Sequence, residues 1–132
     1  MSDANLATVE RVIAAVNARD VESYLACCTQ DFELHTPLVA VAGVYQGSAG
    51  VRRFFADLED AALDYRLHVE RVRAVGAEQV LAFVDVTATG RASGLPAGTS
   101  TTNVYDLVDG KVRRIRIFTD RRQGLEAVGL RE

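Results

Sequence analysis

Two charged residues near the end of the chain have the types and spacing for proton-transfer chemistry. Asp120 and Arg116 follow a β-strand-like alternation that puts both on one side of the strand. An arginine placed there would hold the carboxylate ionised, or would bind an anionic substrate oxygen. Asp120 could equally cap a following helix, and Arg116 could lie on an exposed face because Ile115 and Ile117 need the buried one. The sequence leaves both interpretations open.

His35 is the candidate for a third proton carrier. It lies in a short extended segment, 32–36, which ends at Pro37. A neutral imidazole beside a carboxylate relays protons near neutral pH. A half-buried histidine with one backbone partner is the alternative. His68 lies among charged residues and is expected at the surface.

Aromatic and amide side chains could shape a pocket for a small molecule. Aromatic rings offer large apolar contact areas, although the same rings serve equally well as core. An amide that points inward from a strand needs a hydrogen-bond partner, and Asn103 is such a candidate. The residues expected to line a pocket are Tyr24, Tyr45, Phe54, Asn103 and Phe118. Asp85 is a candidate second carboxylate, or a partner in a salt bridge.

Neither a metal nor a cofactor is expected. Cys27 and Cys28 are adjacent, so a disulfide between them would be strained. Only two histidines are available to complete a metal site. The chain also lacks the glycine-rich fingerprints that bind dinucleotides or phosphates.

The elements that must position these residues follow from hydrophobic periodicity. The expected helices cover 6–16, 21–28 with Asp20 as N-cap, and 51–62 after a cap at Ser48. The expected strands cover 65–75, 79–92, 99–108 and 111–118, with a hairpin turn at 109–110. We expect a loop or hooked strand at 38–47, and a short helix or edge segment after Asp120.

Helices followed by long hairpin strands predict an α+β fold. A curved antiparallel sheet would pack helices on one face. Strands of ten or more residues must bend, and a bent sheet folded over helices encloses a cone in which a ligand would sit. The length of 132 residues fits a single domain covering 1–132.

Composition limits the classes of partner. Hydrophobic residues make up 48% and charged residues 25%, which is typical of a soluble globular protein. The net charge of −3 offers no positive surface for nucleic acid. The first residues lack the pattern of a signal peptide, and no apolar stretch reaches the ~20 residues that span a bilayer. We therefore expect a cytoplasmic protein with no nucleic-acid or membrane partner.

The order of several motifs resembles the SnoaL-like branch of the NTF2-like superfamily. The motifs are YQG at 45–47, VRRFF at 51–55, TGRASG at 89–94, YDLVDGKVRRIRIFTDR at 105–121 and GLEAVGL at 124–130. The resemblance covers essentially the whole chain and implies a cone-shaped α+β domain. It also implies a homodimer that packs through the outer face of the sheet. The superfamily includes cyclases, isomerases, dehydratases and epoxide hydrolases, so the fold alone does not give the function.

The resemblance also implies a role for Asp120. In SnoaL-like polyketide cyclases, an aspartate at this position is the general acid/base of the ring-closing aldol step. In epoxide-hydrolysing relatives an arginine lies between two aspartates, a place that Arg116 could take. His35 lies where the superfamily has pocket residues.

The chain departs from each of these known site patterns. Thr36 stands where the ketosteroid isomerases have their base, and Val12 stands near their oxyanion-binding tyrosine. The cyclases pair their aspartate with a histidine on the preceding strand, and no histidine occurs between Asn103 and Asp109. No second aspartate is easy to place around Arg116.

Two hypotheses follow. The first is a cofactor-free isomerase, cyclase or hydratase that acts on a small, mostly apolar molecule with Asp120 as general acid/base. The second is a non-catalytic module that binds a small ligand or forms a dimer. An Asp120 carboxylate inside an enclosed cavity favours the first hypothesis, and a carboxylate that caps a surface helix favours the second.

Overall fold

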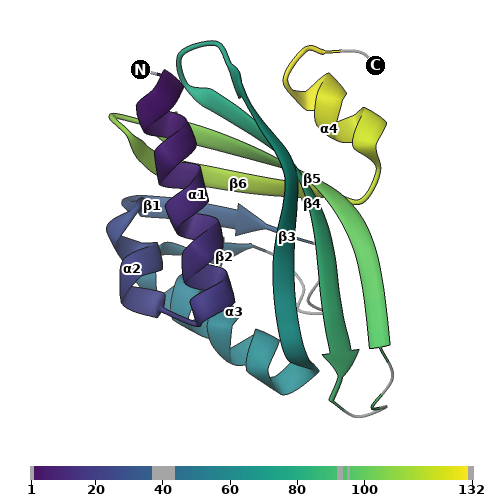
Figure 1. The fold of residues 1–132 in the computed structure, drawn as a ribbon. Helices are drawn as coiled ribbons and strands as arrows, with labels where there is room; N and C mark the ends of the chain where they lie inside the picture. Colours follow the sequence, from purple (N-terminus) through teal and green to yellow (C-terminus); the bar gives the residue numbers. More distant parts are fainter. Residues whose placement is uncertain (1, 37–43, 92–93, 95, 131–132) are drawn as a thin grey trace.

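The computed structural model describes residues 2–36, 44–91, 94 and 96–130, and it shows helices packed against a curved sheet (Figure 1). The helices are α1 (Ser2–Ala18), α2 (Val21–Ala26), α3 (Gly47–Ala61) and α4 (Arg121–Ala127). The strands are β1 (Cys28–His35), β2 (Tyr45–Gln46), β3 (Ala62–Val75), β4 (Gln79–Gly90), β5 (Pro96–Val108) and β6 (Lys111–Phe118). The expectations for Pro37 and for 38–43 lie outside the described residues. The α+β cone is confirmed.

The N-terminal helices form where the periodicity predicts them. The stripe on α1 is buried, including Val9 and Val12. Asp20 caps α2, and its side chain accepts a hydrogen bond from the backbone N–H of Ser23. The predicted cap at Ser48 is wrong, because Gly47 turns the chain out of β2 with a φ of +61° and the helix begins there.

One pair of strands differs from the antiparallel sheet that the sequence predicts. The strand order is β2-β1-β6-β5-β4-β3, and β1 runs parallel to β6 while the other pairs are antiparallel. No hairpin joins β1 to β6. The chain passes through β2, α3, β3, β4 and β5 before it reaches β6, so the parallel direction is accessible. β1 also begins earlier than expected, because Cys28 already pairs with Val112.

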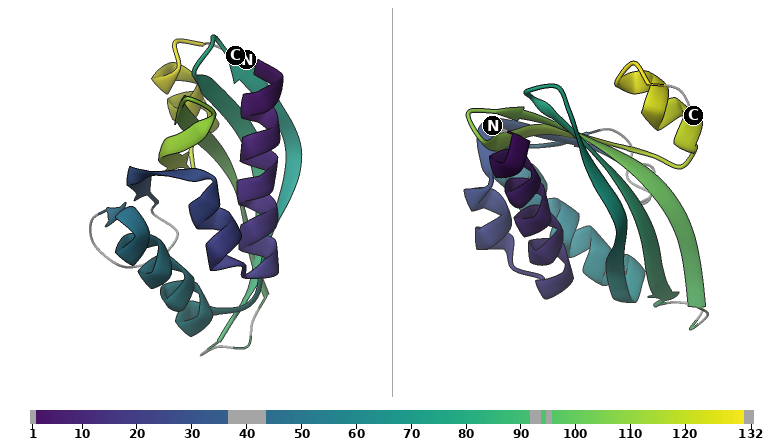
Figure 2. Two further views of the ribbon diagram at one scale, coloured as in Figure 1. Left: turned by 90° about the vertical axis from the view of Figure 1, so that its left-hand side faces the viewer. Right: turned by 45° about the horizontal axis from the view of Figure 1, so that its top comes forward.

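The sheet has an inner face and an outer face (Figure 2, right). Along β4, Val84 and Val86 belong to the core shared with the N-terminal helices. Leu81 and Phe83 belong to a second cluster on the opposite face, where α4 packs. Alternation along one strand therefore supplies two separate apolar surfaces.

Helix α4 covers much of the apolar surface on the outer face. Leu125 packs with Leu81, Phe83 and Val104. The guanidinium of Arg121 lies 4.0 Å from the centre of the Phe83 ring. The apolar residues of the outer face, through which the resemblance implies dimer packing, are thus partly covered by α4 of the same chain. The homodimer stays a prediction.

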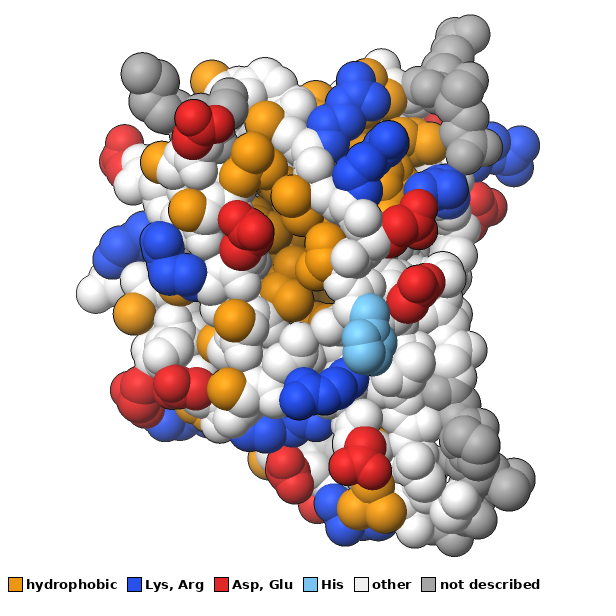
Figure 3. All heavy atoms as spheres, in the orientation of Figure 1, with side chains coloured by type: hydrophobic (Ala, Val, Ile, Leu, Met, Phe, Trp, Pro, Cys, Tyr) orange, Lys and Arg blue, Asp and Glu red, His pale blue; other side chains and the backbone are white. Residues whose placement is uncertain are grey.

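Side-chain hydrogen bonds fasten α1 to the edge strand β3. The Asn17 amide donates to the carbonyl of Leu67 at 2.9 Å and accepts from its N–H at 2.8 Å. Hydrophobic side chains gather between the two elements, with charged groups on either side (Figure 3). In the described part of the chain, no helix is long and apolar enough to cross a membrane.

Candidate functional site

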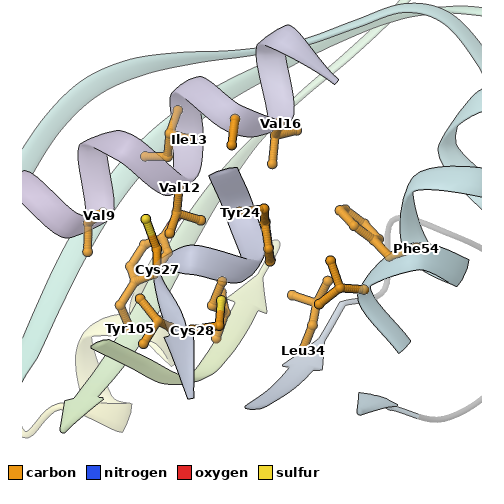
Figure 4. Packing of buried hydrophobic residues seen from close by; sticks show 14 of the residues in the cluster. Val9, Val12, Ile13, Val16, Tyr24, Cys27, Cys28, Leu34, Phe54 and Tyr105 are labelled. Atoms are coloured by element: carbon orange, nitrogen blue, oxygen red, sulfur yellow. The ribbon is translucent and has the colours of Figure 1, made fainter. Parts of the chain in front are cut away.

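The inner face of the sheet and the helices enclose a hollow, which we call the cone cavity. It contains about 410 Å³ of empty space when the part open to solvent is counted, and about 30 Å³ of that space admits water-sized guests. Side chains from α1, α2, α3 and β1 point into this region (Figure 4). The lining residues are Val12, Ile13, Val16, Tyr24, Leu34, Phe54, Tyr65, Leu67, Val86, Thr101, Asn103, Tyr105, Ile115 and Ile117. The cavity is therefore mostly aliphatic and aromatic.

A ladder of three polar side chains on β5 crosses this apolar lining. The hydroxyl of Thr101 donates to Oδ1 of Asn103 at 2.8 Å. Nδ2 of Asn103 then donates to the Tyr105 hydroxyl at 3.3 Å. All three residues are buried, so their polar atoms depend on each other for hydrogen bonds.

Three phenols line the cavity, and burial keeps them protonated. Burial raises the pKa of Tyr24 well above its usual value, and neighbouring Tyr105 and Tyr65 raise it further. Burial also raises the pKa of Tyr65 to about 12 and that of Tyr105 to about 12. The cavity thus presents uncharged hydroxyl groups at neutral pH.

Three of the five residues expected to line a pocket do so: Tyr24, Phe54 and Asn103. Tyr45 is buried beside them, but its hydroxyl donates to Asp57 at 2.7 Å and its ring packs on Phe54 outside the lining. Phe118 lies in the outer cluster with α4.

The three residues expected to transfer protons do not meet in the cone cavity. Asp120 is exposed and caps α4, accepting a hydrogen bond from the N–H of Arg122 at 2.9 Å. Arg116 shares the outer face, where it contacts Asp106 at 3.5 Å. The reason is the alternation of β6, which gives the inner face to Ile115 and Ile117.

His35 also points away from the cavity. On β1 it follows Leu34, whose side chain lines the cavity, and it pairs with Glu33 at 3.0 Å. The hydrogen bond from His35 lowers the pKa of the Glu33 carboxyl. Both side chains are about one-third exposed, so the pair is accessible to solvent.

The capping geometry predicts a structural role for Asp120. Asp120→Ala is expected to cost about 1 kcal/mol of unfolding free energy, because the first turn of α4 loses its side-chain acceptor. Asp120→Asn keeps an acceptor oxygen and is expected to lie within about 0.5 kcal/mol of the parent. Urea unfolding followed by circular dichroism measures both. Equal stability of Asp120→Ala and the parent would contradict the capping role.

Sequence analysis did not predict three of the polar residues that line the cavity: Tyr65, Thr101 and Tyr105. A signal was present, because residues 101, 103 and 105 occupy alternate positions on one strand and therefore share a face. Since Asn103 was already a candidate, its neighbours two residues away on either side were candidates as well.

The other candidate residues of the sequence, Cys27, Cys28, His68 and Asp85, are not part of the lining of the cone cavity. Among the described residues, no three histidine, cysteine, aspartate or glutamate side chains gather as a metal site. Cys27 and Cys28 are both buried, and burial raises the pKa of the Cys28 thiol to about 12. His68 is exposed, as expected. Asp85 is exposed and accepts a hydrogen bond from Ser100 at 2.7 Å.

Solved structures with the same fold are numerous at low sequence identity. TerC, co-crystallised with polyporic acid, is 22% identical with a TM-score of 0.79, and the match covers 95% of this chain and 98% of TerC. An NTF2-like protein of unknown function from Burkholderia pseudomallei is 18% identical with a TM-score of 0.80, over 96% and 98% of the two chains. A Mycobacterium tuberculosis protein in complex with estradiol-17β-hemisuccinate is 15% identical with a TM-score of 0.74, over 89% and 95%. These likenesses show an NTF2-like fold.

Sequence comparison gives the family. No curated protein matches the chain. The model of the SnoaL-like domain matches residues 9–115, which include the cavity-lining parts of the helices and most of the sheet. The match covers well over half of the chain, so this protein belongs to the family of SnoaL-like domains.

Proposed function

We propose that this protein binds a small, uncharged, mostly apolar molecule in the cone cavity. The observation that carries the proposal is the lining itself, in which aliphatic and aromatic side chains surround a few neutral polar groups. Pockets of this composition bind small molecules by apolar contact and use the polar groups to fix orientation. Two structural neighbours, TerC and the Mycobacterium tuberculosis protein, were crystallised with small molecules, which supports small-molecule binding by this fold but not the choice of an uncharged ligand.

The charge of the lining favours an uncharged ligand. The side chains that line the cavity are aliphatic or aromatic, or carry hydroxyl or amide groups. Transfer of an ion into such surroundings is costly unless an opposite charge accompanies it. The cone cavity therefore recognises a neutral molecule. Asp120, Arg116 and His35 lie outside the cavity lining and do not contact this ligand.

The proposal is tested with two six-membered ring compounds of similar size, methylenecyclohexane and cyclohexanecarboxylate. Chemical shifts in a two-dimensional NMR spectrum are expected to change with methylenecyclohexane at residues around the cavity, and not with the carboxylate. Val86→Phe extends a ring into the cavity and is expected to weaken binding at least tenfold.

Val69→Phe is the matched control, because it is the same substitution at an exposed position of the neighbouring strand β3. It is expected to bind like the parent. Absence of binding by methylenecyclohexane, or equal loss in the two variants, would refute the proposed function. Overpacking at Val86 costs about 1–3 kcal/mol, so thermal unfolding is recorded to confirm that each variant is folded.

A further inference from the structure

We propose that the cone cavity selects ligands that present a hydrogen-bond acceptor, such as a ketone or quinone carbonyl oxygen, to the hydroxyls of Tyr24, Tyr65 and Tyr105. This inference rests on the proposed function and names the chemistry of the ligand's polar group. It follows from the direction in which the hydrogen bonds of the ladder run.

The hydrogen bonds of the ladder all run in one direction, from Thr101 through Asn103 to the Tyr105 hydroxyl, whose own hydrogen has no acceptor in the ladder. The Thr101 hydroxyl donates to the amide oxygen of Asn103 at 2.8 Å, and the amide nitrogen of Asn103 donates to the Tyr105 hydroxyl at 3.3 Å. The Tyr105 hydroxyl therefore accepts from the amide, and its own hydrogen is left to donate elsewhere. The next group along the ladder must be an acceptor.

The other two phenols add donors at the same place. The hydroxyls of Tyr24 and Tyr65 donate to no other described residue, although Tyr24 is 1% and Tyr65 7% exposed. Tyr24, Tyr65 and Tyr105 all line the same cavity, and Tyr65 and Tyr105 contribute to the raised pKa of Tyr24. Three unused O–H donors around one space complement an acceptor oxygen with lone pairs.

The acceptor is a neutral oxygen and not a carboxylate. Among the described residues, Arg19 is a cation beside one of the phenols, and its guanidinium lies 5.8 Å from the centre of the Tyr65 ring. That guanidinium is already occupied, because it donates to the backbone carbonyls of Val16 and Tyr65 and pairs with Glu59 at 3.4 Å. A buried anion would have hydrogen bonds but no free countercharge, and its desolvation would be uncompensated.

The size of the cavity suits the polar head group of a ligand. The part of the hollow that admits guests, about 30 Å³, has room for one or two water-sized groups, which is the scale of a carbonyl. The apolar body of the ligand would then contact the aliphatic lining toward the open part. In the absence of ligand, water is expected to occupy the same polar space.

The test compares cyclohexanone with methylenecyclohexane, which has the same shape but carries =CH₂ in place of the carbonyl oxygen. The parent protein is expected to bind cyclohexanone about tenfold more tightly, since the carbonyl gains hydrogen bonds that the hydrocarbon lacks. The C=O stretching band of bound cyclohexanone is expected to move to lower frequency than in an apolar solvent. Both dissociation constants are measured by NMR titration.

Tyr24→Phe and Tyr105→Phe each remove one donor and are expected to reduce the preference for the ketone severalfold. The preference is the ratio of the two dissociation constants measured in the same variant, so a change that affects both compounds equally cancels. Tyr24→Phe is the primary variant, because Tyr105→Phe also removes the acceptor for Asn103. Tyr45→Phe is the control, since the Tyr45 hydroxyl bonds Asp57 and is not part of the lining. It is expected to keep the full preference.

The outcomes separate the two proposals. If neither compound binds, the proposed function fails. If both bind with equal affinity, or if the preference survives in Tyr24→Phe and Tyr105→Phe, binding stands and the acceptor inference is overturned. Loss of the preference in Tyr45→Phe would also overturn it, because the effect would then not depend on the three phenols.

Discussion

Replacing Gly124 with alanine is expected to destabilise the protein by about 2 kcal/mol and to loosen α4 from the sheet. A Cβ at this position would overlap Cγ2 of Thr102 and lie 2.8 Å from its Cβ. Thr102 belongs to β5, which is paired on both sides and cannot move away easily. Overpacking of this kind costs about 1–3 kcal/mol. Glycine to alanine normally stabilises a helix by about 1 kcal/mol, so a net loss identifies the contact as its cause.

Urea unfolding measures this effect against a matched control. Gly98→Ala makes the same change on β5, where the added Cβ would meet only the carbonyl oxygen of Val86 at an ordinary 3.5 Å. It is expected to lie within about 0.5 kcal/mol of the parent. Thr102→Ser removes Cγ2, so combining it with Gly124→Ala is expected to restore part of the loss. A Gly124→Ala protein as stable as the parent would contradict the close contact between α4 and β5.

Where local signals are strong, the sequence predicts the fold well. The Asp109–Gly110 turn forms as expected, and both residues have positive φ values, 51° and 77°, as a tight hairpin of this type requires. Asp20 caps α2 for a similar reason, since its side chain accepts a hydrogen bond from the backbone N–H of Ser23, three residues further along the chain. These features depend on neighbours in sequence, which a single chain displays directly.

The errors arise where position depends on distant parts of the chain. Alternation correctly puts Arg116 on one side of β6 and Ile115 on the other, but it does not say which side faces the helices. Asp120 lies on the same outer side as Arg116, and its side chain caps α4 at the surface. The parallel pairing of β1 with β6 likewise depends on a long connection that leaves no local mark.

The candidate site shows the same limit. Tyr24, Phe54 and Asn103 were expected in a pocket because their side chains suit one, and the structure brings them together from α2, α3 and β5. Tyr45 has the same chemistry but faces Asp57 on α3 instead. Residue type alone does not separate these cases, because the direction of each ring is set by packing between elements.

Raising the pH above 10 is expected to unfold the protein before its tyrosines ionise in the folded state. The chain has four tyrosines, and burial raises the pKa of every one. Tyr45, Tyr65 and Tyr105 rise to about 12, and Tyr24 rises further. In the unfolded chain the pKa of a tyrosine is about 10. The stabilisation is therefore complete below pH 10 and is lost as the pH rises toward 12.

The size of the loss follows from proton linkage. Between pH 10 and 12 the folded protein holds protons that the unfolded chain releases, so each tyrosine lowers the unfolding free energy by up to about 1.4 kcal/mol per pH unit. Four such groups acting together remove an amount comparable with the whole stability of a typical domain, about 5–15 kcal/mol. The Cys28 thiol, with a pKa of about 12, adds to the same trend from about pH 9 upward.

Absorbance at 295 nm, which reports phenolate, and circular dichroism, which reports the fold, are expected to change together in one transition above pH 10. In urea the same protein is expected to titrate near pH 10, because its tyrosines are then exposed. Tyr45→Phe removes one linked proton from outside the cavity and is expected to make the alkaline transition less steep. Phenolate formation near pH 10 with native circular dichroism would show that the phenols are accessible to solvent. The three hydroxyls of the cone would then be free to exchange hydrogen bonds with bulk water, and their selection of a ligand carbonyl would lose its physical basis.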